Sequence, residues 1–191
     1  NLPVAQLDGP ARELRLLVDH RENLVAERTR SMNRLRWYLH ELDPSWEPKT
    51  RTLSRYVTLN KVTKHLEEHQ GMVAVLAREL VDDIRAATKR INELERQILV
   101  RVRVLAPTVM QLVGVGALTA AKLIGEAADI RRFTSKDAFA RHNGTAPIPV
   151  WSGNRERHRL SRSGNRQINA AIHRMAITQA RCHPDAVAFI N

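Results

Sequence analysis

The chain has 191 residues, which suits one ordinary domain or two small ones. Hydrophobic residues make up 43% and aromatic residues only 4%, so we expect an aliphatic core built by helices. The formal net charge of +11 indicates a polyanionic partner, most often DNA or RNA. The single cysteine, Cys182, excludes a disulfide within the chain and argues against a cysteine-based zinc site. No apolar run reaches the roughly 18 residues that span a bilayer, so we expect no membrane partner.

The first predicted element is a long amphipathic helix from Ala11 to Leu42, after an extended lead-in over residues 1–10. Its apolar residues recur at helical spacing while charged residues occupy the opposite face. The helix should stop at Asp43, because the residue before Pro44 is pushed out of the helical region. A shorter helix is predicted from about Leu53 to His69. Its expected inward-facing residues are Tyr56, Val57, Val62 and Leu66.

The clearest periodicity lies in the next stretch, which ends at Pro107. Spacings of four and three predict a heptad seam, interrupted near its end by an arginine. The seam residues are Leu80, Ile84, Ala87, Ile91, Leu94, Ile98, Arg101 and Leu105. The two long helices fit either a dimerising coiled-coil arm or an ordinary helical bundle. We place a domain boundary near residue 106, with a coiled-coil assembly region over 1–106 and a second domain over 107–191.

A Gly-Val-Gly turn at residues 114–116 opens the second domain. A short helix ends there and a helix of small residues begins, which is typical of a helix-hairpin-helix. Glycine lets the backbone approach a ligand closely, and the new helix points its free N–H groups at an anion. Gly114 and Gly116 are therefore candidate phosphate-binding residues, with Lys122 adding charge. The alternative is that the glycines only allow two helices to pack closely.

The segment from Trp151 to Arg166 is rich in arginine and serine. If residues 155–159 are extended, Arg155, Arg157 and Arg159 share one face. Arginine binds two phosphate oxygens at once, and a serine among arginines suits phosphoryl transfer through a covalent serine phosphate. Because Ser152 is followed by glycine, we expect it in an exposed, mobile loop. The alternative is a flexible basic loop that only grips a nucleic-acid backbone. A helix is predicted to follow from Gln167 to Ala180.

The histidines of the second domain do not predict a metal site. His142, His158, His173 and His183 lack the short helical spacing with an acid between them that metal ligands usually show. We expect them to be surface or phosphate-adjacent residues, and we expect no metal ligands in the chain.

Several of these motifs together resemble the C-terminal transposase domain of the insertion sequence one-ten family. The resemblance covers roughly residues 108–182 and is carried by Leu112–Gly116, Ala146-Pro147, Ser152-Gly153 and the run Arg157–Asn169. The preceding segment is similar to the coiled coil of the same family. Two positions depart from the family pattern. Val113 stands where a proline usually precedes the glycine, and residues 141–144 replace a more usual aromatic and alanine.

The resemblance implies a site-specific DNA recombinase that moves its own element, guided by a bridge RNA. It implies an upstream RuvC-like domain whose acids bind Mg²⁺, so we expect this chain to be a C-terminal fragment that is inactive alone and needs no cofactor itself. Family members form dimers and tetramers in which one subunit's acids meet another's serine. A bacterial cytoplasmic, nucleoid-associated location is expected.

The resemblance makes Ser152 the expected nucleophile, with Ser161 and Ser163 in reserve. Arg155, Arg157 and Arg159 are the candidates for holding the scissile phosphate. Arg162, Asn165 and Arg166 complete the predicted nucleic-acid-binding set. The expected fold is mainly α, with a long helical hairpin followed by a small helical domain that contains a helix-hairpin-helix. The competing hypotheses are a non-enzymatic binding module and a coiled-coil interaction protein with an incidental basic tail.

Overall fold

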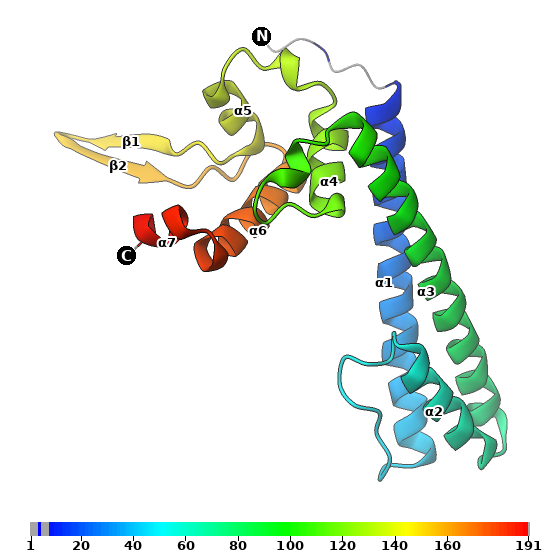
Figure 1. Cartoon of the computed structure of the whole chain (residues 1–191). Coiled ribbons are helices and arrows are strands. Elements are labelled where there is room, and N and C mark those ends of the chain that lie inside the picture. The colour runs from blue at the N-terminus through cyan, green and yellow to red at the C-terminus, as the bar shows by residue number, and fades with distance from the viewer. Residues whose placement is uncertain (1–3, 5–7, 191) are drawn as a thin grey trace. The chain divides into compact units, whose positions relative to one another are not determined.

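A computed structural model describes residue 4 and residues 8–190 of the chain, and it is mainly α, as predicted (Figure 1). Most of the predicted lead-in, at residues 1–3 and 5–7, lies outside the described residues. The helices are α1 (Pro10–Leu42), α2 (Tyr56–Glu67), α3 (Met72–Leu105), α4 (Ala117–Ala127), α5 (Lys136–Asn143), α6 (Arg166–Cys182) and α7 (Pro184–Ile190). Two 3₁₀ turns, η1 (Val109–Gln111) and η2 (Ile130–Arg132), and two strands, β1 (Ile148–Ser152) and β2 (Arg155–Arg159), complete it.

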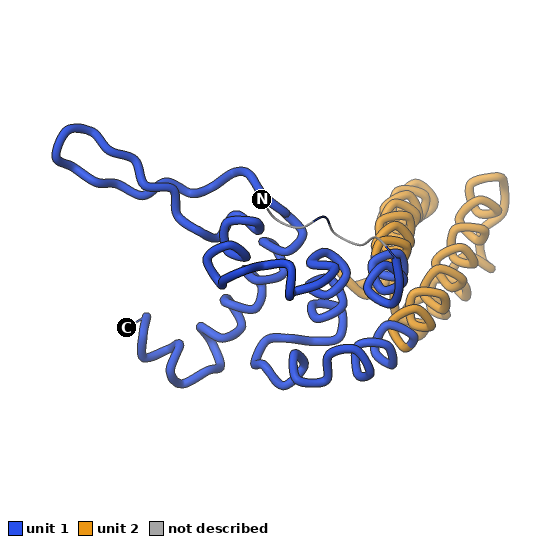
Figure 2. Tube along the Cα trace, turned by 90° about the horizontal axis from the view of Figure 1, so that it is seen from above, with its two compact units in different colours: residues 1–18, 97–191 blue, residues 19–96 orange. Residues whose placement is uncertain are grey.

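The chain forms two compact units (Figure 2). Unit 2 comprises residues 19–96, and unit 1 combines residues 1–18 with residues 97–191. The long helices α1 and α3 therefore each contribute to both units. The domain boundary near residue 106 stays a prediction, although it coincides with the end of α3 at Leu105.

The core of unit 2 is a layer of aliphatic side chains from α1, α2 and α3. Leu35 and Leu39 of α1 pack with Ile84 of α3, and Leu53 of the connecting loop is also buried. Arg21 reaches across the helices to Glu95, with its Nη2 2.6 Å from the carboxylate oxygen, and Arg28 donates to the Thr88 hydroxyl at 3.1 Å. Polar contacts thus lie beside a mainly apolar seam.

Helix α2 is shorter than predicted. The prediction that Tyr56 and Val57 face inward is wrong. Tyr56 and Val57 are exposed, whereas Leu59, Val62 and Leu66 are fully buried. The spacing of three and four between these buried residues sets the phase of the helix, and Tyr56 and Val57 lie at its first two positions, off that stripe.

The predicted seam of α3 is buried at Leu80, Ile84, Ile91, Leu94 and Ile98. Its last positions differ from the prediction, because Val102 is fully buried while Arg101 is partly exposed and Leu105 is exposed. A step of four from Ile98 to Val102 follows the 3.6-residue helical repeat, so the seam continues without the arginine interruption. Within unit 1 this end of α3 packs with Leu14 and Val18 of α1. The dimerising arm stays a prediction.

The core of unit 1 joins the ends of α1 and α3 to α4. Val115, Ala120 and Ala121 pack with the α1 and α3 residues of this cluster. The small side chains permit a close approach, and Gly125 shows how close it is. A β-carbon added at Gly125 would lie 3.0 Å from the Arg15 Cα.

Among the described residues, no helix is both long enough and apolar enough to cross a membrane.

The α1–α3 packing predicts that alanine substitutions at Ile98 and Val100 of α3 change the free energy of unfolding by very different amounts. Ile98→Ala removes a fully buried side chain and should lower the free energy of unfolding by about 2–5 kcal/mol. Val100→Ala changes a side chain that is 60% exposed and should shift it by less than about 0.5 kcal/mol. Urea unfolding of both variants measures the difference, and equal values would contradict the packing described.

Candidate nucleic-acid interface

The predicted loop around Ser152 is instead an antiparallel β-hairpin with a two-residue turn. Ser152 ends β1 and pairs with Arg155, so Gly153 and Asn154 form the turn. Gly153 has a φ of +58°, whereas Asn154 is not among the described non-glycine residues with positive φ, which are Arg51 and Ala128. Glycine at the first turn position followed by negative φ is the pattern of a type II′ turn. The expected mobile loop is therefore corrected to a paired strand end.

The strand register places Ser152 on the same face as three arginines. Ser152 pairs with Arg155, Val150 with Arg157 and Ile148 with Arg159. Since side chains alternate across a strand, the three arginines share one face, as the sequence predicted for an extended segment. Every residue of β2 is exposed, and so is Ser152. The structure thus brings the expected nucleophile and its three expected phosphate ligands onto one open surface, which we call the arginine face.

The opposite face of the hairpin carries Trp151, Glu156 and His158. His158 Nε2 lies 3.7 Å from Glu156 Oε1, and Trp151 is 67% exposed. Glu156 is the sole acid between residues 148 and 166, a stretch that holds five arginines. Because that acid projects from the other face, its charge is directed away from the arginine face. The arginine face therefore presents guanidinium donors, which suit phosphate oxygens.

The two reserve serines sit differently from Ser152. Ser161 is only 6% exposed, and its Oγ lies 3.1 Å from the Ser163 Oγ. Residues 163 and 164 pack backbone to backbone against residues 142–144, so a β-carbon at Gly164 would lie 2.6 Å from the His142 carbonyl oxygen. These two serines belong to the base of the hairpin, and Ser152 to its tip.

Asn165, which was expected to bind nucleic acid, has a structural role within the fold. Its Oδ1 accepts hydrogen bonds from the backbone N–H groups of Gln167 and Ile168, which caps α6. Its Nδ2 donates to Glu126 Oε2 at 2.7 Å. Both ends of the side-chain amide are thus engaged within the protein. Arg162 and Arg166, by contrast, are exposed on either side of it.

Glu126 is the residue of this region that sequence reasoning missed. Its side chain is 4% exposed, and Oε1 lies 3.5 Å from Arg15 Nε while Oε2 accepts from Asn165. A buried carboxylate needs such partners. The available signal was a charged residue among the small and apolar residues of α4.

His142 also serves the packing. Its ring lies 5.0 Å from the Phe133 ring, and its backbone carbonyl accepts from the Asn165 N–H at 2.8 Å. Burial lowers the pKa of His142 below its usual value, and the positive charge of Arg132 lowers it further. The imidazole is therefore mainly neutral at neutral pH.

The Gly-Val-Gly turn lies between a single 3₁₀ turn, η1, and α4. Gly114 has a φ of +84°, and a β-carbon there would lie 3.0 Å from Thr178 Cβ and 3.1 Å from the Met175 carbonyl oxygen of α6. Gly116 precedes α4 with open space around it. Lys122 is 3% exposed, so its ammonium group is not available at the surface. Gly114 thus packs closely against α6, whereas Gly116 has open space at its α-carbon. The phosphate-binding role of both glycines stays a prediction.

These features lie in a segment that matches the model of a protein family. Residues 106–191 match the family model described as Transposase IS116/IS110/IS902 family. This part of the chain is similar to a transposase family. A search of curated proteins finds no match to the chain. The transposase-like segment contains the Gly-Val-Gly turn, the whole hairpin and α6, so the arginine face is a feature of that segment.

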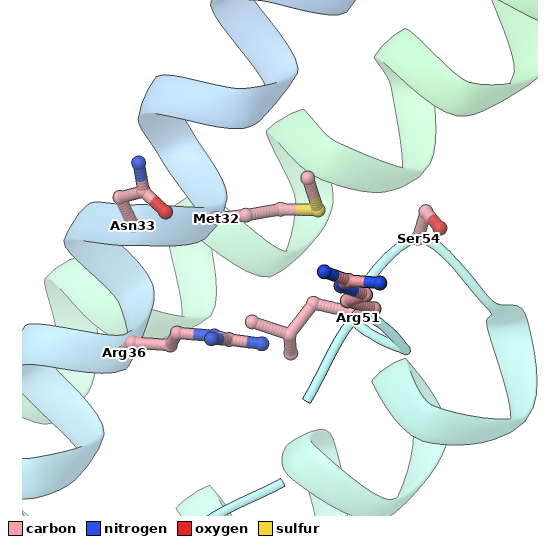
Figure 3. A pocket seen from close by; sticks show the side chains of 6 residues that line it. Met32, Asn33, Arg36, Arg51 and Ser54 are labelled. Atoms are coloured by element: carbon pink, nitrogen blue, oxygen red, sulfur yellow. The ribbon is translucent and has the colours of Figure 1, made fainter. Parts of the chain in front are cut away.

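A pocket of about 300 Å³ lies apart from these residues, within unit 2 (Figure 3). It is lined by Met32, Asn33, Arg36, Arg51, Leu53 and Ser54. Met32 projects from α1 toward the loop that carries Arg51 and Ser54. None of the predicted site residues lines this pocket, so it is not part of the arginine face.

The two glycines of the turn should respond differently to the same substitution. Gly114→Ala adds both left-handed strain and a clash with α6, and it should lower the free energy of unfolding by roughly 2–4 kcal/mol. Gly116→Ala meets no neighbouring atom and should cost less than about 1 kcal/mol. Thermal and urea unfolding test this. If Gly114→Ala is as stable as Gly116→Ala, close packing is not the role of Gly114.

Proposed function

We propose that this chain is the C-terminal part of a DNA transposase that acts as a site-specific recombinase, with Ser152 as its nucleophile. The observation that carries the proposal is the placement of Ser152 at the exposed tip of a hairpin, on the same face as Arg155, Arg157 and Arg159. The similarity of residues 106–191 to a transposase family supports the same class of reaction.

In the proposed step, Ser152 Oγ attacks a DNA phosphorus atom. A serine–phosphate bond forms while the bond between phosphorus and one bridging oxygen breaks, and the leaving oxygen takes up a proton. Attack by a hydroxyl of another strand then reverses the step, releases serine and joins the strands. The energy of the phosphodiester is conserved in the covalent intermediate, so strand exchange needs no external energy source.

The arginines supply binding and charge stabilisation in this proposal. A guanidinium group presents paired N–H donors that match two phosphate oxygens and stabilise the extra negative charge of the transition state. Arg155 is the nearest in register to Ser152, as its cross-strand partner. Arg157 and Arg159 lie further along the same face and suit the neighbouring phosphates of one strand.

The base that accepts the Ser152 proton comes from elsewhere in this proposal. Glu156 and His158 project from the opposite face of the hairpin. We therefore propose a composite site in which the acids of a RuvC-like domain, on another subunit, face Ser152. Those acids would hold Mg²⁺, whose positive charge would stabilise the leaving oxygen.

The remaining features of the proposal follow the family resemblance. The partners are target and donor DNA, a guide RNA and further copies of the same protein, joined through α1 and α3. The location is the bacterial cytoplasm, associated with the nucleoid. The exposed arginines Arg162 and Arg166 would contact the nucleic-acid backbone on either side of the hairpin base.

The decisive variant is Ser152→Ala in the natural protein that also carries the RuvC-like domain. Strand cleavage should fall by roughly 10³-fold or more, since the nucleophile is lost. The covalent protein–DNA adduct seen on a denaturing gel should disappear, and DNA affinity should be unchanged. Mass spectrometry of the wild-type adduct should place the phosphate on the peptide that contains Ser152.

Ser163→Ala is the matched control, because Ser163 is also an exposed serine near arginines. It should cleave DNA at the wild-type rate. The alternative function is a non-enzymatic module in which the arginine face only grips a phosphate backbone. Wild-type recombination by Ser152→Ala would reject Ser152 as nucleophile, and the absence of any adduct in wild type would favour that alternative.

DNA binding by the 191-residue chain should depend on the arginine face. Replacing Arg155, Arg157 and Arg159 together by glutamine should weaken binding and reduce the slope of log K against log salt by about 2.7, for three lost phosphate contacts. The control replaces Arg30, Arg34 and Arg96, three exposed arginines of unit 2, and removes the same charge. Equal slopes for the two triple variants would show that net charge, not the hairpin, drives binding.

A further inference from the structure

A cluster of metal-ligand types lies in unit 2, apart from the hairpin. Asp43 follows the last residue of α1, His65 lies in the last turn of α2, and His69 follows that helix. One ligand atom from each of these three side chains lies within 4.8 Å of the other two. The two histidines are four residues apart, which is a spacing typical of paired metal ligands.

The Asp43 carboxylate is oriented by its own loop. Its Oδ1 accepts hydrogen bonds from the Ser45 N–H at 2.9 Å and from the Ser45 hydroxyl at 2.6 Å. Its Oδ2 faces His65 Nε2 at 3.6 Å. One oxygen is therefore held in place while the other remains available as a ligand.

His65 presents a buried nitrogen that makes no hydrogen bond within the described part of the chain. Its Nε2 is inaccessible to solvent, and the side chain is 11% exposed. Trp46 stacks on the imidazole with a centroid distance of 4.1 Å, which fixes the plane of the ring. A buried polar atom without a hydrogen bond is costly, and the nearest acceptor, Asp43 Oδ2, is too far away at 3.6 Å to provide one. This nitrogen therefore points to a ligand that the cluster could hold.

His69 has the hydrogen bond that typically orients a metal-binding imidazole. Its Nδ1 lies 3.0 Å from the His65 carbonyl oxygen, so a proton on Nδ1 is donated there and Nε2 keeps its lone pair. Arg78 donates to the Leu66 and His69 carbonyl oxygens at 3.0 and 2.7 Å. These two hydrogen bonds from Arg78 hold the residues that follow α2 in place.

We propose that Asp43 Oδ2, His65 Nε2 and His69 Nε2 bind a zinc ion. Two imidazoles and one carboxylate are a common donor set for zinc, with a fourth position open to water. Around a tetrahedral zinc ion the ligand atoms lie roughly 3.3 Å apart. The 3.6 Å between Asp43 Oδ2 and His65 Nε2 is close to that spacing. The three ligand atoms all lie within 4.8 Å of one another, so the side chains would draw closer together around the ion.

Zinc at this cluster would join the end of α1 to the end of α2. The 43–55 loop connects these helices, and its Leu53 and Trp46 pack against the core of unit 2. The ion would fix the ends of this loop, and because it binds the folded site, it would stabilise unit 2. The proposal does not depend on the recombinase chemistry.

Zinc titration of the tag-free, chelator-treated 191-residue chain tests the proposal. Isothermal titration should give one saturable zinc site per chain, and the melting temperature should rise with zinc. Cobalt, as a spectroscopic substitute, should give a visible absorption band typical of four-coordinate geometry. Asp43→Asn and His69→Gln should each weaken binding by roughly tenfold or more. Asparagine can still accept the Ser45 hydrogen bonds, so the loop conformation should survive.

His20→Gln is the control, because His20 is an exposed histidine of unit 2 outside the cluster. It should bind zinc as wild type does. Circular dichroism of every variant checks that the helices are retained. The proposal is overturned if the folded wild-type chain shows no saturable one-to-one binding, or if Asp43→Asn and His69→Gln bind zinc as tightly as His20→Gln.

Discussion

The arginine face depends on how the base of its hairpin is held. Neither strand is buried, so the hairpin has no core of its own. The chain leaves α5 at Gly144 and returns at Gly164, where the two backbones pack without room for a β-carbon. Asn165 then joins this contact to the rest of unit 1, since it caps α6 and bonds Glu126. Both ends of the hairpin are held there, while the two-residue turn at its tip sets the register that aligns Ser152 with the arginines.

The helices of this protein could largely be predicted from the sequence, because their signals are local. Proline closes α1 and α3 at the expected places, and the apolar period gives most of the buried seam. The phase of α2 could not be predicted, since Tyr56 and Val57 satisfy the hydrophobic pattern as well as Leu59 does. Which of them is buried depends on where α2 begins, and no proline or capping side chain marks that residue.

The site was predictable from the sequence only where its features depend on local signals. Alternating arginines predict a shared face once the segment is extended. The Gly153-Asn154 pair is a local signal for a two-residue hairpin turn, and the prediction of a loop overlooked it. The long-range role of Asn165 has no local signal, because Glu126 lies 39 residues away. Lys122 and Gly114 look like phosphate ligands in a basic sequence, yet tertiary packing buries the first and presses the second against α6.

The two units differ in how their polar side chains are paired. In unit 1 the polar side chains of Glu126 and Asn165 are paired within the fold, and three arginines line one face of an exposed hairpin. In unit 2 a buried imidazole nitrogen remains without a hydrogen bond beside a carboxylate oxygen. An exposed unpaired guanidinium is solvated by water and costs little, whereas a buried unpaired nitrogen is costly. The exposed arginines of the hairpin therefore suit a polyanion that binds and dissociates. The buried nitrogen of His65 suits a ligand that stays bound to the folded chain.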